Sequence, residues 1–200
     1  LPAGLSEDQL EVQVESEAVI PVHTVSQRQE FASRTIRPKI HRLLPDYLVP
    51  LENHDLRLTA RDWDAGLDVS DPATLTATLP IDHSVPPGEE EGGENAALDM
   101  LEDFITRKLE GYATRRNDPT VDGSSRLSAY LHYGHLSPLS AALSAREHAG
   151  PGTDAFLEEL VVRRELSFNL CTFNPAYDRY EGLPGWARAT LEEHAGDRRE

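Results

Sequence analysis

A stretch between residues 115 and 134, RRNDPTVDGSSRLSAYLHYG, concentrates arginine and hydroxyl groups in a chain that is otherwise acidic. Ser124, Ser125 and Arg126 follow an Asp-Gly turn, and the pattern predicts that they open a helix ending near Gly134. The free N–H groups of a first helical turn, joined by hydroxyls and a guanidinium, favour binding of a phosphate group. Ordinary N-capping, the commoner role of such serines, is the alternative interpretation.

A second candidate region is the predicted helix of about residues 154–171, FLEELVVRRELSFNLC from Phe156 onward. Its apolar residues leave little purely polar face, which indicates a largely buried helix. Charges inside such a helix are costly unless they are paired or face a cleft. Glu159 and Arg163 are four residues apart, with the acid first, which favours an ion pair along the helix. The segment therefore predicts either a structural ion-pair ladder or a cleft wall that presents an acid and arginines to a polar ligand.

Other reactive side chains suggest less chemistry. His132 and His135 are separated by the helix-breaking Gly134, and no cysteine or carboxylate completes a metal-binding set, so we expect no metal site. The single cysteine, Cys171, is expected in the core, and Trp186 is expected to pack at the start of a helix. The glycine-rich phosphate loops and the nucleophile elbow of serine hydrolases do not occur in the sequence.

The overall charge limits the partners that the chain can attract. The sequence has 19 basic and 35 acidic residues, a formal net charge of −16, and Lys39 and Lys108 are its two lysines. Bulk electrostatics of this sign repel nucleic acids and anionic membranes, so an anion site must be built locally from arginines. The acidic excess with scarce lysine suggests a source that lives at high salt or has a GC-rich genome. We expect no membrane segment, because no apolar run approaches the roughly 20 residues of a span.

The elements that position these residues change in character along the chain. Residues 11–25 alternate in a way that predicts one or two short strands, and a capping pattern at Ser26 predicts a helix after them. Residues 50–93 are acidic, rich in turns and typical of a linker. From residue 94 onward, helical periodicity predicts an all-helical region, with Ser137-Pro138 as one helix start.

Several of these motifs, taken in order, resemble a known family. RRNDPTVDGSSRLSAYLHYGHLSP resembles the flavin-phosphate region of the photolyase/cryptochrome family. FLEELVVRRELSFNLCTFNPAYDRYEGLPGWARATLEEHAGDRRE resembles the class II cyclobutane pyrimidine dimer photolyases, and VSQRQEFASRTIRPKI resembles the end of their N-terminal domain. The resemblance covers about residues 10–48 and 94–200. Family members continue past the position of Glu200, which suggests that the chain is an internal fragment.

The resemblance implies a mainly α fold. Residues 1–49 would be the C-terminal end of an α/β antenna domain, residues 50–93 an interdomain linker, and residues 94–200 the first half of the helical FAD-binding domain. It also implies the roles of individual residues. FAD would contact Tyr112, Ser124, Ser125, Arg126, Leu127, Ser128 and Phe156. Glu159 would be the catalytic acid that binds the lesion bases, and Arg116, Arg163 and Arg164 would face DNA.

The implied activity is light-driven DNA repair, in which reduced FAD passes an electron to a cyclobutane pyrimidine dimer. Photolyases are among the named examples of enzymes that extrude the target base from the stack. An antenna chromophore is expected without being identifiable, and the protein is expected to act as a cytoplasmic monomer. The fragment alone is expected to be inactive. Two alternatives stay open: a cryptochrome-like blue-light sensor without repair, and an inactive remnant.

Overall fold

The computed structural model describes residues 17–52, 70–86, 88 and 90–198. They form two compact units, one from the residues up to Pro50 together with Gly93 onward, and one from Leu51–Gly92. These two boundaries lie close to the ends of the predicted linker, while the assignment of residues 1–49 and 94–200 to two named domains stays a prediction. In the smaller unit, helix α3 (Pro72–Ala77) is capped by Asp71, whose side chain accepts hydrogen bonds from the N–H groups of Ala73 and Thr74.

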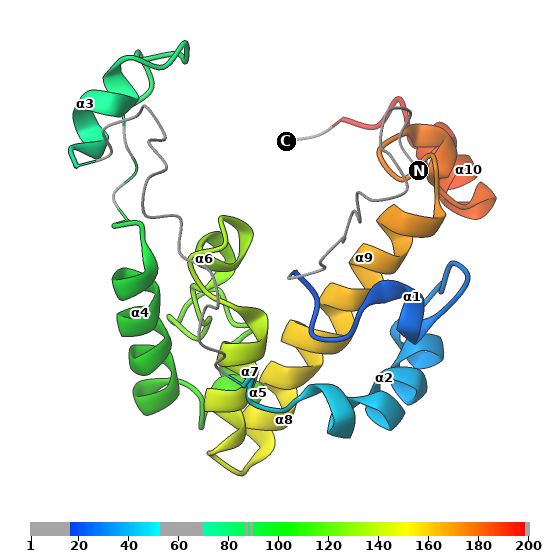
Figure 1. Ribbon diagram of the computed structural model, residues 1–200. Coiled ribbons are helices and arrows are strands. Elements are labelled where there is room, and N and C mark those ends of the chain that lie inside the picture. The colour runs from blue at the N-terminus through cyan, green and yellow to red at the C-terminus, as the bar shows by residue number, and fades with distance from the viewer. Residues whose placement is uncertain (1–16, 53–69, 87, 89, 199–200) are drawn as a thin grey trace, which may run out of the picture. The chain divides into compact units, whose positions relative to one another are not determined.

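The described part of the larger unit is helical, which agrees with the mainly α prediction (Figure 1). Its first half along the chain contains α1 (Val22–Val25), α2 (Ser33–Tyr47), α4 (Glu94–Arg107), α5 (Tyr112–Arg115), α6 (Ser128–His132) and α7 (Pro138–Arg146). One continuous rod follows, made of α8 (Pro151–Leu157), the π-helical η1 (Glu158–Arg163) and α9 (Arg164–Phe173). The 3₁₀ turn η2 (Tyr180–Gly182) and α10 (Gly185–Glu193) complete it.

The rod organises the packing of this unit. The helices α5 and α7 pack against α8, α2 packs on η1, and α1 packs on α9 (Figure 1). The core gathers buried apolar side chains from these elements other than α9 and from the segments beside them, among them Ile20, Ile36, Ile40, Phe104, Leu127, Val161 and Val162. The close approach of α8 requires glycine at position 152, since a Cβ there would lie 1.7 Å from the backbone oxygen of Leu109.

The strand prediction for residues 11–25 is wrong in its described part. Residues 11–16 lie outside the described residues, and Val22–Val25 form α1. The backbone of this region is paired with side chains of α9 instead of with another strand. The N–H of Ile20 donates to Glu165 Oε1 over 2.9 Å, and the N–H of Glu30 donates to Asn169 Oδ1 over 2.6 Å. These bonds satisfy buried donors that would otherwise need a sheet.

Helix boundaries agree with the sequence in some places and differ in others. As predicted, the Ser137 side chain accepts a hydrogen bond from Ser140 N and Pro138 is the first residue of α7. The capping pattern at Ser26 does not start a helix, because α2 begins at Ser33 and the Ser26 hydroxyl donates to Glu30 instead. The rod is buried along α8 and η1, but it emerges into solvent near its end, so Cys171 is exposed and not in the core. Trp186 is also exposed, against expectation.

Candidate functional site

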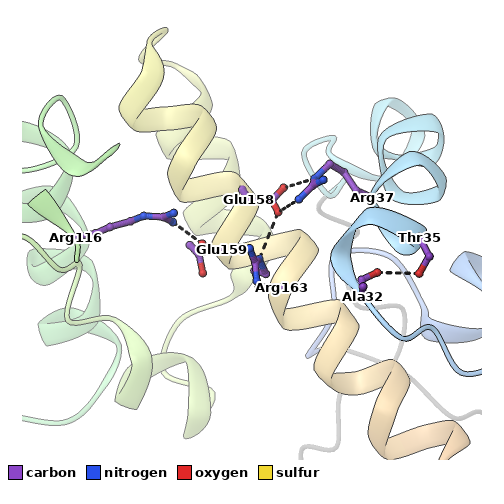
Figure 2. A network of polar contacts seen from close by, with 7 residues as sticks. All are labelled: Ala32, Thr35, Arg37, Arg116, Glu158, Glu159 and Arg163. Carbon is purple, nitrogen blue, oxygen red and sulfur yellow. Dashed lines mark hydrogen bonds and ion pairs between the residues drawn. The ribbon is translucent and has the colours of Figure 1, made fainter. Parts of the chain in front are cut away.

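The middle of the rod presents two adjacent glutamates in opposite directions. Glu158 and Glu159 open the π-helical turn η1, and Figure 2 shows their carboxylates directed to the two sides of the rod. Single π-helical turns inside α-helices are rare and occur frequently at functional sites. The turn therefore marks this part of the rod as the first place to look for a site.

Glu159 is held by an arginine from the region of α5. Arg116 Nη1 donates to Glu159 Oε1 over 2.5 Å, and the pair is partly buried (Figure 2). The guanidinium also lies over the ring of Tyr112, with 5.8 Å between its carbon and the ring centroid. Its Nε atom is buried and makes no hydrogen bond within the described part of the chain. A buried donor without an acceptor costs stability, so this atom offsets part of what the ion pair contributes.

A pocket of about 220 Å³ opens beside this ion pair. Three separate stretches of sequence contribute to its lining: α5, α6 with the loop that leads into it, and the rod. The lining residues are Tyr112, Ser125, Ser128, Leu131, Phe156, Glu159, Leu160 and Arg164. All but Leu131 and Leu160 are residues that the sequence singled out. The structure therefore brings together a phenol, two hydroxyls, a carboxylate and a guanidinium at one small cavity.

Aromatic rings form the floor behind the polar groups. Tyr112 and Phe156 meet edge to face with centroids 5.8 Å apart, and both pack on the fully buried Phe104. Edge-to-face pairs of this kind add stability beyond the area that they bury. Burial raises the pKa of the Tyr112 phenol, the charge of Glu159 raises it further, and Arg116 opposes both. The phenol is therefore neutral near pH 7 and can donate a hydrogen bond.

The helix start expected at Ser124 is not present. The helix α6 begins at Ser128, and Arg126 adopts a left-handed backbone conformation with φ of 57° just before it. Ser124 is exposed and does not line the pocket, and Arg126 points to Asp122, with 3.1 Å between Nε and Oδ1. Leu127 is fully buried in the core. Of this predicted phosphate cradle, Ser125 and Ser128 remain at the pocket.

The predicted ion pair between Glu159 and Arg163 is wrong. Arg163 Nε lies 3.5 Å from Glu158 Oε1, five residues away, because a π-helical turn brings residue i toward residue i+5. Arg164 lines the pocket and also bonds Glu17, with 3.0 Å from Nη2 to Oε2. The side chain that pairs with Glu159 is Arg116, 43 residues away in sequence.

The opposite side of the rod carries a set of residues that sequence reasoning missed. Arg37 from α2 donates to both oxygens of Glu158, over 2.9 and 2.6 Å (Figure 2). Hydrogen bonding from Arg37 lowers the pKa of Glu158, and burial opposes it. A larger, mostly apolar groove of about 670 Å³ lies on this side, between α2, α7 and the rod. No local pattern signals the pair, since the partners are 121 residues apart.

The pocket suits one part of a flavin dinucleotide. Its two hydroxyls, its one arginine and its aromatic rings match the phosphates, ribose hydroxyls and ring systems of such a molecule. Its volume of about 220 Å³ lies below the roughly 300–1,000 Å³ typical of sites for drug-sized ligands. The rest of a bound FAD would therefore lie outside this pocket.

Metal and membrane chemistry find no support among the described residues. No group of three or more His, Cys, Asp or Glu side chains there could hold a metal ion. No described helix is both long enough and apolar enough to cross a bilayer.

The chain is similar to curated proteins along nearly its whole length. It is 40% identical over 188 residues to a deoxyribodipyrimidine photo-lyase of Methanothermobacter thermautotrophicus and 39% identical over 199 residues to one of Oryza sativa. A third relative of the same name, from Arabidopsis thaliana, is 39% identical over 201 residues. Each alignment covers 94% of this chain and 41%, 39% and 40% of the respective relative. No protein-family model matches the chain.

These similarities confirm the resemblance to photolyases that the sequence motifs indicate. A further relative of the same name, from Potorous tridactylus, is 36% identical over 199 residues. The chain spans about two fifths of the length of the relatives named above.

Proposed function

We propose that the chain is the part of a class II cyclobutane pyrimidine dimer photolyase that binds a portion of FAD and presents Glu159 to the lesion. The observation that carries the proposal is the single pocket that unites Tyr112, Ser125, Phe156 and Glu159. These residues come from separate stretches of the sequence. Similarity to photolyases over 94% of the chain supports the same function.

In the proposed mechanism, FAD supplies a light-excited electron donor when it is bound in its reduced form. Ser125 and Ser128, which line the pocket, would hold polar groups of the cofactor by hydrogen bonds, and Phe156 and Tyr112 would offer apolar surface to its rings. The carboxylate of Glu159 accepts hydrogen bonds from N–H groups of the damaged pyrimidines. Arg116 fixes that carboxylate in place over 2.5 Å. The chain supplies position and charge, and no hydrolytic base is required.

Local arginines reconcile this function with a net charge of −16. Arg116 and Arg164 lie at or beside the pocket, while much of the acidic excess is spread over other elements such as α4. Contacts with DNA phosphates depend on arginine side chains close to the phosphates, because exposed charges farther away than about 10 Å are screened at about 0.1 M salt. We therefore propose that DNA approaches the pocket side of the rod.

The test is Glu159→Gln in the intact protein, reduced and illuminated with blue light in the presence of dimer-containing DNA. A carboxylate hydrogen bond contributes about 1.5–3 kcal/mol, so affinity for the dimer should fall roughly 10- to 100-fold. Repair per absorbed photon should fall as well, while flavin absorbance stays unchanged. Glu102→Gln, which removes an exposed carboxylate from α4, serves as the matched control.

Two results would redirect the assignment. Unchanged repair in Glu159→Gln would remove Glu159 from the lesion site. A wild-type protein that binds FAD and never splits dimers would favour the light-sensor alternative, and one that binds no FAD would favour the remnant.

A further inference from the structure

The π-helical turn allows two different partners for Arg163. In an α-helix, residues four apart lie on one face, so Arg163 would pair with Glu159. Residues five apart would be turned about 140° away from each other at 3.6 residues per turn. In the structure Arg163 lies beside Glu158 instead, 3.5 Å from its carboxylate. The helical register of η1 therefore decides which glutamate Arg163 contacts.

In the π-helical register of η1, Glu159 faces the pocket and Arg163 does not contact it. Glu158 is occupied on the far side of the rod by the two hydrogen bonds from Arg37 and by Arg163 (Figure 2). Glu159 then meets Arg116 and lines the pocket. An α-helical register would bring Arg163 into competition with Arg116 for the carboxylate of Glu159. A π-helical turn is intrinsically less favourable than an α-helical one, so contacts outside the rod must support it.

We propose that Arg37 is a positioning residue, which holds Glu158 on the far side of the rod, preserves the π-helical register and so keeps Glu159 in the pocket. Arg37 comes from α2, which packs on η1, and it reaches Glu158 with a fork of two hydrogen bonds. A bidentate fork fixes orientation as well as distance. The importance of this arrangement for repair rests on the proposed function, whereas the arrangement itself can be tested without FAD or DNA.

The measured quantity is the pKa of Tyr112. It is obtained from an NMR titration of the chain with ring-labelled tyrosine, and the signal of Tyr112 is identified by its loss in Tyr112→Phe. Glu159 raises the pKa of Tyr112, so its withdrawal toward Arg163 should lower that pKa. Arg37→Gln should therefore shift the pKa of Tyr112 downward, as Glu159→Gln does. The sign is diagnostic, because loss of the positive charge of Arg37 without any rearrangement would shift the pKa of Tyr112 upward.

A double-mutant cycle completes the test. In a Glu159→Gln background, Arg37→Gln should produce no further downward shift, since the group that it positions is already neutral. Arg37→Lys retains the positive charge but loses the two-pronged hydrogen bond to Glu158, so it should lower the pKa of Tyr112 by an intermediate amount. This variant replaces Arg37→Gln in the test if Arg37→Gln does not fold. Arg107→Gln, which removes an exposed arginine paired with Asp103 on α4, is the matched control and should leave Tyr112 unchanged.

An unchanged or raised pKa of Tyr112 in Arg37→Gln would overturn the proposal, as would an equal downward shift in both backgrounds. In the intact protein, Arg37→Gln should weaken dimer binding as Glu159→Gln does, with unchanged flavin absorbance. A wild-type protein without repair activity would refute the proposed function, while the shift of Tyr112 would still decide the role of Arg37.

Discussion

At the scale of single residues, one buried carboxylate is held by side chains that lie close to it in sequence. Glu30 is a buried carboxylate of the segment between α1 and α2, and only 6% of it is exposed. Its side chain accepts hydrogen bonds from Ser26, over 2.8 Å, and from Lys39. Burial alone would raise the pKa of Glu30, but hydrogen bonds from Lys39, Thr35 and Ser26 outweigh it and lower the pKa from 4.5 to about 2.

This carboxylate predicts a specific dependence of stability on pH. Because the folded-state pKa is the lower one, the stabilisation is fully present above about pH 4.5 and is lost as the pH falls toward 2. It amounts to at most about 3 kcal/mol. Urea unfolding of wild type and Glu30→Gln should show a difference in unfolding free energy that is large at neutral pH and shrinks at acid pH. A difference independent of pH would contradict the lowered pKa.

Residue types at the site could be read from the sequence, but their pairing could not. The motifs place Tyr112, Ser125, Phe156 and Glu159 among the candidates, and the structure gathers them at one pocket. The partner of Glu159, by contrast, is Arg116, which directly follows α5 and does not belong to the helix of Glu159. A pairing rule for α-helices applies only where the helix is α, and nothing in the sequence announced the π-helical turn.

At the scale of elements, the clearest dependence is the approach of α8 to the end of α4. Gly152→Ala would place a methyl group 1.7 Å from the oxygen of Leu109, so the rod would have to move. We expect a loss of about 2 kcal/mol or more in unfolding free energy, as for other overpacked sites. Gly185→Ala at the start of α10, where a Cβ meets nothing within 4 Å, should change stability little in the same denaturant titration. Equal stability of the two variants would argue against this close contact.

Elements with a strong local signal were predicted well. The apolar spacing of α4 and the Ser-Pro start of α7 gave the correct helices, since both signals act within one or two turns. The strand expected near Val22 is absent, and the N–H of Ile20 there donates to buried Glu165 of a distant helix. The helix expected from Ser124 failed because Arg126 has a positive φ, which an α-helix cannot contain.

For the whole molecule, the dominant property is charge. A net charge of −16 disfavours the compact state by self-repulsion, and salt screens it. Raising NaCl from about 0.1 M to about 1 M shortens the Debye length from about 10 Å to about 3 Å. The thermal midpoint followed by circular dichroism should therefore rise with salt. An uncharged osmolyte at matched osmolality is the control, and a midpoint that is insensitive to NaCl would contradict this interpretation.

The exposed end of the rod has a practical consequence. Cys171 is the only cysteine of the sequence, and it is exposed on the same continuous helix that carries Glu159. A spin label or fluorophore can therefore be attached at one defined point without engineering. A change in the mobility or emission of that label on adding flavin or damaged DNA would then report ligand binding through the helix that carries both Cys171 and Glu159.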